Sequence, residues 1–215
     1  MYELRRKTYG VLMALIEQND AIAILHGHMP AFYGVVDGAW QDYVSYPIEK
    51  RIVHSPRSRA SVVHDHMVDR AAKYAARESG VQIVEKSGLY LFVFGGQIAV
   101  RFKKFDEELR TRNQPSGQVE QFKNQMQLPG VKAAHNLESG YILSSDGQSI
   151  AAVHLVCPSG TGVYWDVLLT ASTQVGVVQD MFANKIAAEQ TDEGAKIKRK
   201  QTAKIIQIAK NDNKS

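Results

Sequence analysis

The sequence predicts an α+β fold on the strength of three observations. Apolar residues recur every three or four positions between residues 58 and 80, as they do on one face of a helix. Three strand-like segments joined by glycine turns follow at once, and a second group of such segments lies between residues 141 and 169. The expected order is a helix, a three-strand antiparallel meander, a second helix, a second antiparallel β unit and a C-terminal helix.

The first 56 residues are expected to form an N-terminal helical subregion. Between Ala21 and Pro56, glycines and prolines interrupt short aromatic segments, which is typical of loops and short helices. Ahead of this region, an apolar stripe with a 3.6-residue period predicts an amphipathic helix from residue 3 to about residue 17, formed by Leu4, Val11, Leu12, Leu15 and Ile16.

The clearest helical pattern begins near Ser58, which is expected to cap the helix, and ends before Gly80. Glycine-containing turns at residues 87–88 and 95–96 are suited to tight hairpins. They separate the three expected strands of the meander, which are Val81–Glu85, Leu89–Phe94 and Gln97–Phe105.

The second half of the chain predicts a further helix and three further strands. A short helix from Gln118 to Gln127 is expected to end before the Leu128-Pro129-Gly130 turn. Turn signals at residues 146–147 and 158–162 then separate strands at Tyr141–Ser144, Ser149–Val156 and Val163–Leu169. Apolar residues in helical phase predict a last helix from Val175 to Glu189.

The positive charge of the chain is concentrated at its C-terminal end. The formal net charge is +4 for all 215 residues, but residues 194–215 alone carry seven cations and one acid, so subtracting their +6 leaves −2 for the rest. We therefore expect a single compact α/β domain at residues 1–193, followed by a basic tail at residues 194–215 that is helical or disordered.

Cysteine content and hydropathy indicate a cytoplasmic protein. A single cysteine, Cys157, excludes an intramolecular disulfide and is expected to be a small packing residue. The N-terminal residues do not have the pattern of a secretory signal peptide. No run of about 18 apolar residues occurs, so no membrane span is expected.

From Ser58 to Ser144 the order of elements resembles the core of PD-(D/E)XK nucleases. That resemblance implies an acid on the second core strand and an acid-x-Lys triplet on the third, where carboxylates hold a divalent metal beside the phosphodiester. Here the residues two positions before the cations of the third strand are Ala99, Arg101 and Phe102, so the expected core lacks the catalytic signature. No catalytic residue, metal or cofactor is assigned.

The same strand carries a candidate contact surface. Strict alternation places Arg101, Lys103 and Phe105 on one face, where cations could pair with phosphates and the aromatic ring could stack on a base. The alternative is a solvated face whose cations pair with the acids at residues 106–108.

The tail supplies a second candidate surface. Its cations could contact nucleic-acid backbone, an anionic membrane surface or an acidic groove on a partner, and the alternative is a solvated segment with no ligand. The residues assigned to nucleic-acid or partner contact are Lys196, Lys198, Arg199, Lys200 and Lys204.

Histidines offer no complete metal site. On a helix, His64 and His66 point about 200° apart and cannot clamp one ion. Across the last expected hairpin, His154 and Asp166 should face each other, as a structural pair or a proton-handling pair.

Three segments look like parts of small uncharacterised proteins of bacterial prophages and plasmids: Val100 to Asp106, Leu128-Pro129-Gly130 and Cys157-Pro158-Ser159-Gly160. The resemblance implies a role in regulation or in conflict between a mobile element and its host. We expect a non-enzymatic regulatory or adaptor protein that binds a protein partner, with DNA or RNA as a further ligand and homo-oligomers as an open alternative. A divergent metal-dependent nuclease or other hydrolase, using Glu85, Asp106 and Glu107, is the rival hypothesis.

Overall fold

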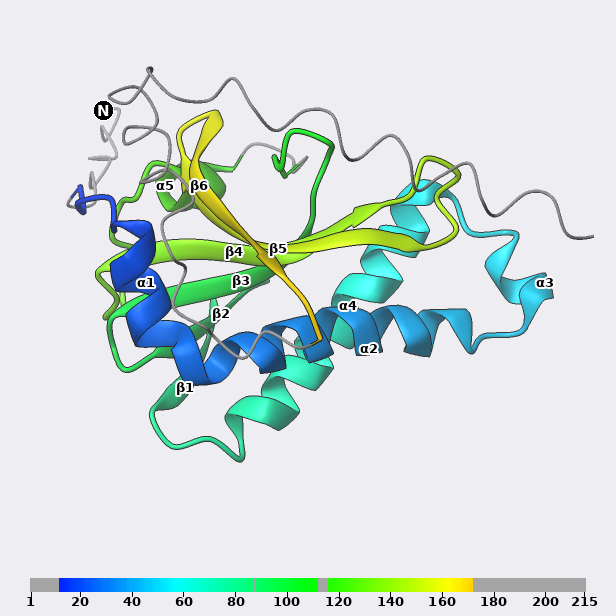
Figure 1. Ribbon diagram of the computed structural model, residues 1–215, viewed down its shortest axis with the longest axis horizontal. Helices are drawn as coiled ribbons and strands as arrows, with labels where there is room; N and C mark the ends of the chain where they lie inside the picture. The colour runs from blue at the N-terminus through cyan, green and yellow to red at the C-terminus, as the bar shows by residue number, and fades with distance from the viewer. Residues whose placement is uncertain (1–11, 87, 112–115, 172–215) are drawn as a thin grey trace, which may run out of the picture. The chain divides into compact units, whose positions relative to one another are not determined.

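The computed structural model describes residues 12–86, 88–111 and 116–171, and it has an α+β fold (Figure 1). Its helical elements are α1 (Gln18–Leu25), the 3₁₀ turn η1 (His26–His28), α2 (Met29–Val44), α3 (Ile48–Arg51), α4 (Pro56–Ala75) and α5 (Gly117–Lys123). Its strands are β1 (Val81–Lys86), β2 (Leu89–Phe94), β3 (Ile98–Lys104), β4 (His135–Leu143), β5 (Ile150–Ser159) and β6 (Gly162–Leu169).

The six strands form one mixed sheet in the order β1-β2-β3-β4-β5-β6. All neighbours are antiparallel except β3 and β4, which run parallel. A parallel pair needs a crossover connection, and the segment that contains α5 supplies it. The two β units expected from the sequence are therefore halves of a single sheet.

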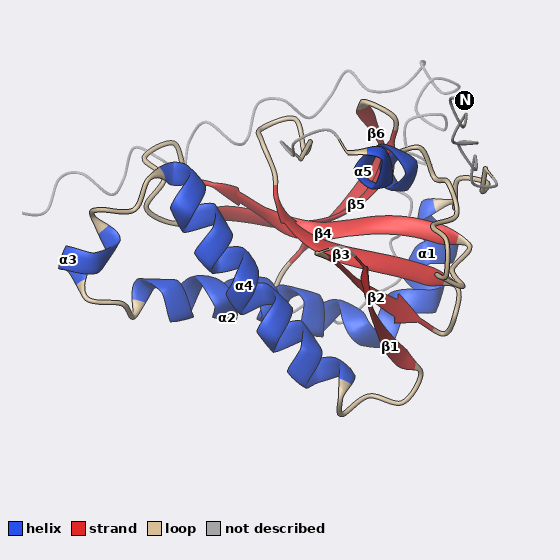
Figure 2. Ribbon diagram, turned by 180° about the vertical axis from the view of Figure 1, so that it is seen from behind, coloured by secondary structure: helices blue, strands red, loops and turns tan. Residues whose placement is uncertain are grey.

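Helices α2 and α4 cover one face of this sheet (Figures 1 and 2). Phe32 of α2 meets Phe94 of β2 and Phe102 of β3 at ring-centroid distances of 5.2 and 6.0 Å. Edge-to-face contacts of this kind hold aromatic rings in a fixed arrangement while burying a large apolar area. This layer forms the main core.

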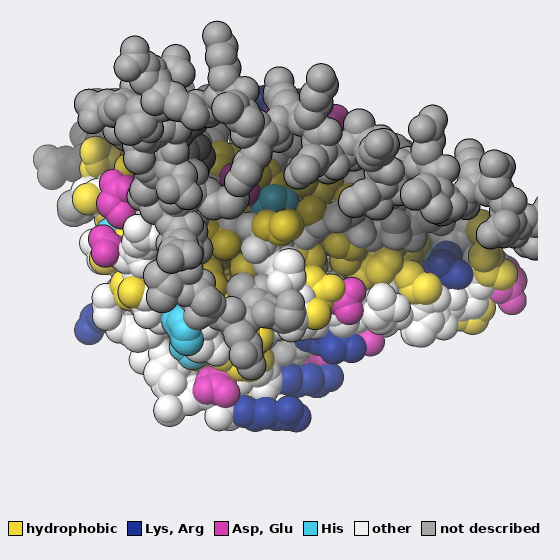
Figure 3. All heavy atoms as spheres, in the orientation of Figure 1, with side chains coloured by type: hydrophobic (Ala, Val, Ile, Leu, Met, Phe, Trp, Pro, Cys, Tyr) yellow, Lys and Arg dark blue, Asp and Glu magenta, His cyan; other side chains and the backbone are white. Residues whose placement is uncertain are grey.

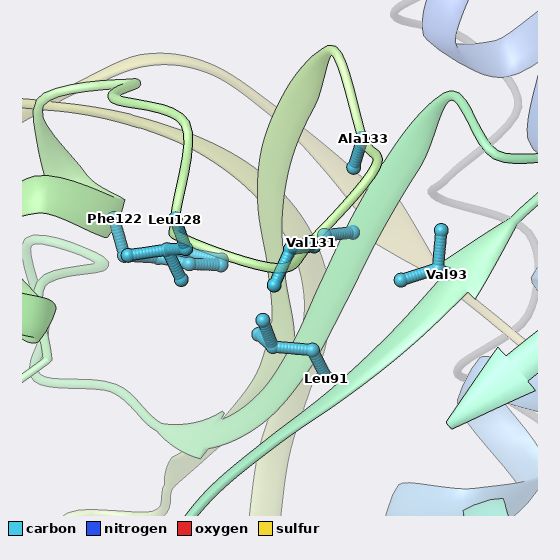
Figure 4. Close-up of a cluster of buried hydrophobic side chains, with 7 residues drawn as sticks. Leu91, Val93, Phe122, Leu128, Val131 and Ala133 are labelled. Atoms are coloured by element: carbon cyan, nitrogen blue, oxygen red, sulfur yellow. The ribbon is translucent and has the colours of Figure 1, made fainter. Parts of the chain in front are cut away.

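The α5 side of the sheet is closed by a second, smaller core (Figure 4). Apolar side chains from β2 and β3 meet residues of α5 and of the segment that leads from α5 into β4. The cluster comprises Leu91, Val93, Ala99, Phe122, Leu128, Val131 and Ala133.

The N-terminal region differs from the sequence-based expectation in two ways. Residues 12–17 are not helical: Leu12 forms an isolated β-bridge with Met126, and the first described helix begins at Gln18. The short helices expected before Pro56 are present as α1, η1 and α3, but the middle of this region is one long helix, α2. Pro30 lies in its first turn, where a missing N–H costs nothing, so the proline starts this helix and does not break it.

Gly38 of α2 marks the close approach of α2 and α4. A Cβ at this position would lie 2.4 Å from Nη1 of Arg70, a residue of α4. The Arg70 guanidinium can therefore lie against the helix backbone, where it donates to both carboxylate oxygens of Asp42, from Nε at 2.6 Å and from Nη2 at 2.7 Å. Gly38, which in the sequence indicates a break in a helix, instead lies within α2 and allows Arg70 to pack closely against it.

The helix α4 agrees with the sequence pattern except at its cap. Ser55 is the N-cap, and its Oγ accepts from the backbone N–H of Ser58 at 3.1 Å. The cap lies three residues earlier than expected because Pro56 occupies the first helical position, where its fixed φ suits the helix. None of the described helices has the length and apolar character needed to cross a membrane.

The largest difference in the strands is at β4, which begins at His135 and not at Tyr141. Its first half is buried but polar, so it lacks the apolar alternation by which strands are recognised. The helix α5 is also shorter than expected and ends at Lys123. The expected helix Val175–Glu189 and the basic tail at residues 194–215 lie outside the described residues.

Candidate functional site: a groove at the ends of β3 and β4

A groove of about 1080 Å³ lies between the first half of α4 and the ends of β3 and β4. Both ribbon views show the start of α4 beside the β4–β5 turn (Figures 1 and 2). Arg59 of α4 fixes this approach by donating to the carbonyl oxygen of Gly147 at 2.8 Å. The lining residues are Pro56, Arg57, Ala60, Ser61, His64, Asp65, Lys103, Lys104, Phe105, Asp106, Glu107, Glu108, Ile142, Leu143, Ser144 and Ser145.

The groove forms where β3 extends beyond β2. The register of β2 and β3 stops at the Phe92↔Val100 pair, so the last four residues of β3 pair with β4 alone. Among the described strands, that part of β3 has a neighbour on one side only, and α4 packs against β3. In open α/β sheets, the carboxyl ends of parallel strands are a frequent place for ligands.

Two lysines that end β3, Lys103 and Lys104, are half-buried in the groove, and Arg57 of α4 is exposed at its rim. Burial and, to a smaller extent, the positive charge of Arg101 lower the pKa of Lys103 to about 8, and the charge of Glu138 partly opposes them. An ammonium group without full solvation favours an anionic ligand, because the ligand would restore the interactions lost on burial.

His64 shares this electrostatic environment. Burial lowers its pKa most, and the positive charge of Lys103 adds to this, while Asp65 acts in the opposite direction. The Nδ1 atom of His64 lies 3.7 Å from a carboxylate oxygen of Asp65. His64 is thus held toward its neutral form inside the groove, whereas His66 points elsewhere and contacts Tyr46 at 3.0 Å.

The acids of the groove lie mainly at its rim. Asp65, Glu107 and Glu108 are exposed, and Arg110 pairs with Glu108 at 2.7 Å and with Asp106 at 3.3 Å. Burial alone would raise the pKa of Asp106, but hydrogen bonds from Arg110 and from the backbone of Glu108 outweigh burial and lower it. Cations are therefore deeper in the groove than most of the carboxylates.

A buried ion pair lies next to the groove. Arg101 of β3 donates from Nε to Oε1 of Glu138 on β4 at 2.7 Å, and its Nη2 contacts the same oxygen. The guanidinium carbon lies 4.4 Å from the ring centroid of Phe122. Its Nη1 has no hydrogen-bond partner among the described residues. Glu138 is thereby engaged by Arg101.

The contact face predicted from the sequence is corrected by this geometry. Arg101 is only 1% exposed and Phe105 is buried as well, so neither offers an accessible surface to a nucleic acid or a partner. The side of the sheet that carries Arg101 is covered because α5 and the segment that follows α5 fold over it. Of the three residues, Lys103 lines the groove as a half-buried cation. The tail cations Lys196, Lys198, Arg199, Lys200 and Lys204 lie outside the described residues.

The acids of the rival nuclease hypothesis do not meet in one place. Asp106 and Glu107 line the groove, whereas Glu85 of β1 does not. In the described part of the chain, no three His, Cys, Asp or Glu side chains are grouped so that they could hold a metal ion. Arg57 and Glu138 could not be identified from the sequence, because their positions at the groove and beside Arg101 depend on contacts between distant segments.

His154 and Asp166 do form a pair, as the hairpin predicted, with Nδ1 and Oδ2 2.9 Å apart. They are diagonal rather than directly opposite, because His154 is in register with Leu168. Cys157, three residues after His154 on β5, is buried, as expected, and burial raises its pKa to about 12, which makes the thiol unreactive.

The function of the groove has to be argued from its own residues, because comparison of the chain with protein-family models, curated proteins and solved structures finds no match.

Proposed function

We propose that the chain is a non-enzymatic regulatory or adaptor protein of a bacterial mobile element, which binds nucleic-acid backbone in the groove and a protein partner on a separate surface. The observation that carries the proposal is the placement of Lys103 and Lys104 inside the groove, with Arg57 at its rim. The link to a mobile element rests on the sequence resemblance alone.

Phosphate oxygens are the ligands that suit this arrangement. Lysine and arginine side chains that pair with phosphates release counterions from the nucleic acid, which makes binding favourable and salt-dependent. Among the described lining residues, Phe105 is the one Phe, Tyr or Trp side chain, and it is buried, so it offers no exposed ring on which a base could stack. Recognition should therefore depend on the backbone and be indifferent to sequence.

The arrangement also supports binding without metal-dependent cleavage. The order α4, β1–β3, α5 and β4, with β4 parallel to β3, is compatible with a PD-(D/E)XK-like core, and we propose that relationship on topology. In such a core the acid of the acid-x-Lys triplet would occupy the position of Arg101, two residues before Lys103. Here that position is a cation whose charge is directed at Glu138.

A protein partner is suggested by an apolar surface at the turn between α2 and α4. Three aliphatic residues, Ile48, Ile52 and Val53, are 64%, 73% and 75% exposed, and we call them the α3 apex. Glu49, Lys50 and Arg51 lie among them in the chain. An apolar centre with a charged rim fits a partner surface that has an apolar pocket and polar margins.

The proposal is tested by measuring the affinity of the full chain for a short DNA duplex and a short single strand across a salt series. The substitutions Arg57→Ala and Lys104→Ala should each weaken binding and reduce the slope of log K against log salt by about 1, since each removes one phosphate contact. Lys73→Ala is the matched control, because Lys73 is an exposed cation of α4 that pairs with Asp69 outside the groove.

Two results would overturn the proposal. Binding that is unchanged in the Arg57 and Lys104 variants would show that the groove is not the nucleic-acid site. Cleavage of either DNA in the presence of Mg²⁺ or Mn²⁺, lost on replacing Glu85, Asp106 or Glu107, would establish the hydrolase instead.

A further inference from the structure

Among the described residues, no side chain forms a hydrogen bond or ion pair with the ammonium group of Lys103. The buried carboxylate of Glu138, whose charge acts on Lys103, is engaged by Arg101. Arg101 lies two residues before Lys103 and so on the same side of β3, where it adds positive charge. The groove therefore destabilises the protonated form of this lysine.

This environment makes Lys103 a nucleophile near neutral pH. With a pKa of about 8, roughly a quarter of its amine is neutral at pH 7.5, against about one part in a thousand for an ordinary lysine. Desolvated lysines next to a second cation are the ones that proteins use to form Schiff bases with carbonyl compounds. The half-buried position in an open groove gives a small carbonyl ligand access to it.

We propose that Lys103 captures the aldehyde of a sugar phosphate as a reversible imine, with the phosphate held by Lys104 and Arg57. The inference deepens the proposed function, since it concerns the same groove. The aldehyde has two sources, the opened sugar of an abasic site in DNA or a free sugar phosphate, and both offer the same carbonyl and phosphate chemistry.

The reaction needs no metal and no oxidant. The lone pair of neutral Nζ attacks the carbonyl carbon, and one N–H proton moves to the carbonyl oxygen to give a carbinolamine. His64, which lines the same groove and is held toward its neutral form, can take the second N–H proton and pass it to the hydroxyl group, which leaves as water while the C=N bond forms. Hydrolysis by one water molecule reverses every step and releases the aldehyde.

The test traps the imine by reduction with sodium cyanoborohydride, followed by mass spectrometry of the digested protein. One arm uses glyceraldehyde 3-phosphate, and the other uses a DNA duplex that carries one abasic site. We expect the adduct on Lys103 in at least one arm, and the arm that reacts identifies the source of the aldehyde. The labelling rate should rise with pH and level off above about pH 8, whereas an ordinary lysine would continue to rise toward pH 10.

Two variants make the test specific. Lys103→Arg keeps the positive charge but cannot form an imine, so the adduct should fall at least tenfold. Lys73→Arg is the matched control, because Lys73 is an exposed lysine of α4 that pairs with Asp69 outside the groove, and it should stay within about twofold of the unmodified chain. Thermal unfolding of each variant shows whether it is folded.

An adduct that persists in the Lys103→Arg variant, or that maps mainly to other lysines, overturns the inference, as does the absence of any adduct on Lys103 in both arms. Its failure is distinguishable from that of the proposed function. Binding of a duplex with a tetrahydrofuran analogue, which has no aldehyde, tests the groove alone and should be retained in Lys103→Arg.

Discussion

Arg101 and Glu138 lie directly across from each other on the parallel strands β3 and β4 and form an ion pair that is almost completely removed from solvent. Both side chains are 1–2% exposed, and the guanidinium also packs on Phe122. The pair joins the two halves of the sheet at its only parallel contact among the described strands.

Removing one member of this pair should destabilise the protein strongly. A buried charge without its partner costs about 3–5 kcal/mol, so we expect Glu138→Gln and Arg101→Met each to lower the free energy of unfolding by this amount. The double variant Arg101→Met with Glu138→Leu should recover most of the loss, because no buried charge remains. Chemical denaturation measures all three, and losses below about 1 kcal/mol in the single variants would contradict a structural role for the pair.

Gly140 is required for the close contact of β3 and β4. A Cβ at this position would lie 1.8 Å from the carbonyl oxygen of Lys103, which is backbone and cannot move aside. Gly140→Ala should therefore lower the free energy of unfolding by about 3 kcal/mol or prevent folding. Gly117→Ala is the control, since nothing lies within 4 Å of a Cβ there, and equal stability of the two variants would contradict the observed register.

The side chain of Gln125 links the segment after α5 to strands β4 and β5. Its side chain donates to the carbonyl oxygens of Asn136 at 2.8 Å and Pro158 at 2.9 Å, and accepts from the backbone N–H of Asn136 at 2.9 Å. Gln125→Ala leaves these buried groups unsatisfied, so we expect a loss of about 3 kcal/mol in thermal or chemical unfolding. The exposed Gln127→Ala should cost less than about 0.5 kcal/mol.

The Asp42–Arg70 pair predicts a dependence of stability on acid pH. The hydrogen bond from Arg70 lowers the pKa of Asp42 below 3.8, although burial opposes it. A group whose folded pKa is depressed contributes stability above its unfolded pKa and loses it as pH falls through the folded value. Because the pair is about a third exposed, its contribution is about 1 kcal/mol.

The measurement compares the unmodified chain with Asp42→Asn by chemical denaturation between about pH 6 and pH 2. The difference in stability should be constant above about pH 5 and shrink toward zero below about pH 3. Asp69→Asn serves as the control, because it alters the exposed Asp69–Lys73 pair of α4. A difference that grows on acidification would contradict the linkage.

Local sequence patterns predicted those elements whose buried side chains recur at a regular helical spacing or whose ends are marked by turn residues. The apolar phase of Val63, Met67 and Ala71 located α4, and these three side chains are buried. The bounds of β2 were predicted to the residue because glycine turns flank it. Such signals lie within a few residues of one another, so the sequence alone contains them.

Contacts between distant segments could not be predicted. The helix α2 contains Gly34 and Gly38, which indicate a loop until α4 packs against it. The exposed face expected at Arg101 is buried because Glu138, 37 residues later, is in register with it on a parallel strand. Lys103 was identified as a contact residue, but the groove around it depends on how α4 approaches β3.

The sequence alone also could not show which lysine and arginine side chains are solvated and which are half-buried. In the space-filling view, lysine and arginine side chains lie along the lower edge with acids beside them, the pattern of a solvated surface (Figure 3). Lys103 and Lys104 of the groove differ because they are half-buried. Composition does not distinguish these two classes of cation, whereas burial does.

The proposed function places nucleic acid in the groove between α4 and the ends of β3 and β4. Ultraviolet crosslinking of the full chain to a short DNA strand, followed by mass spectrometry of the peptides, would locate the bound strand. We predict crosslinks within residues 56–65 and 103–108, which line the groove. Crosslinks confined to residues 194–215, with none in these two segments, would contradict the claim.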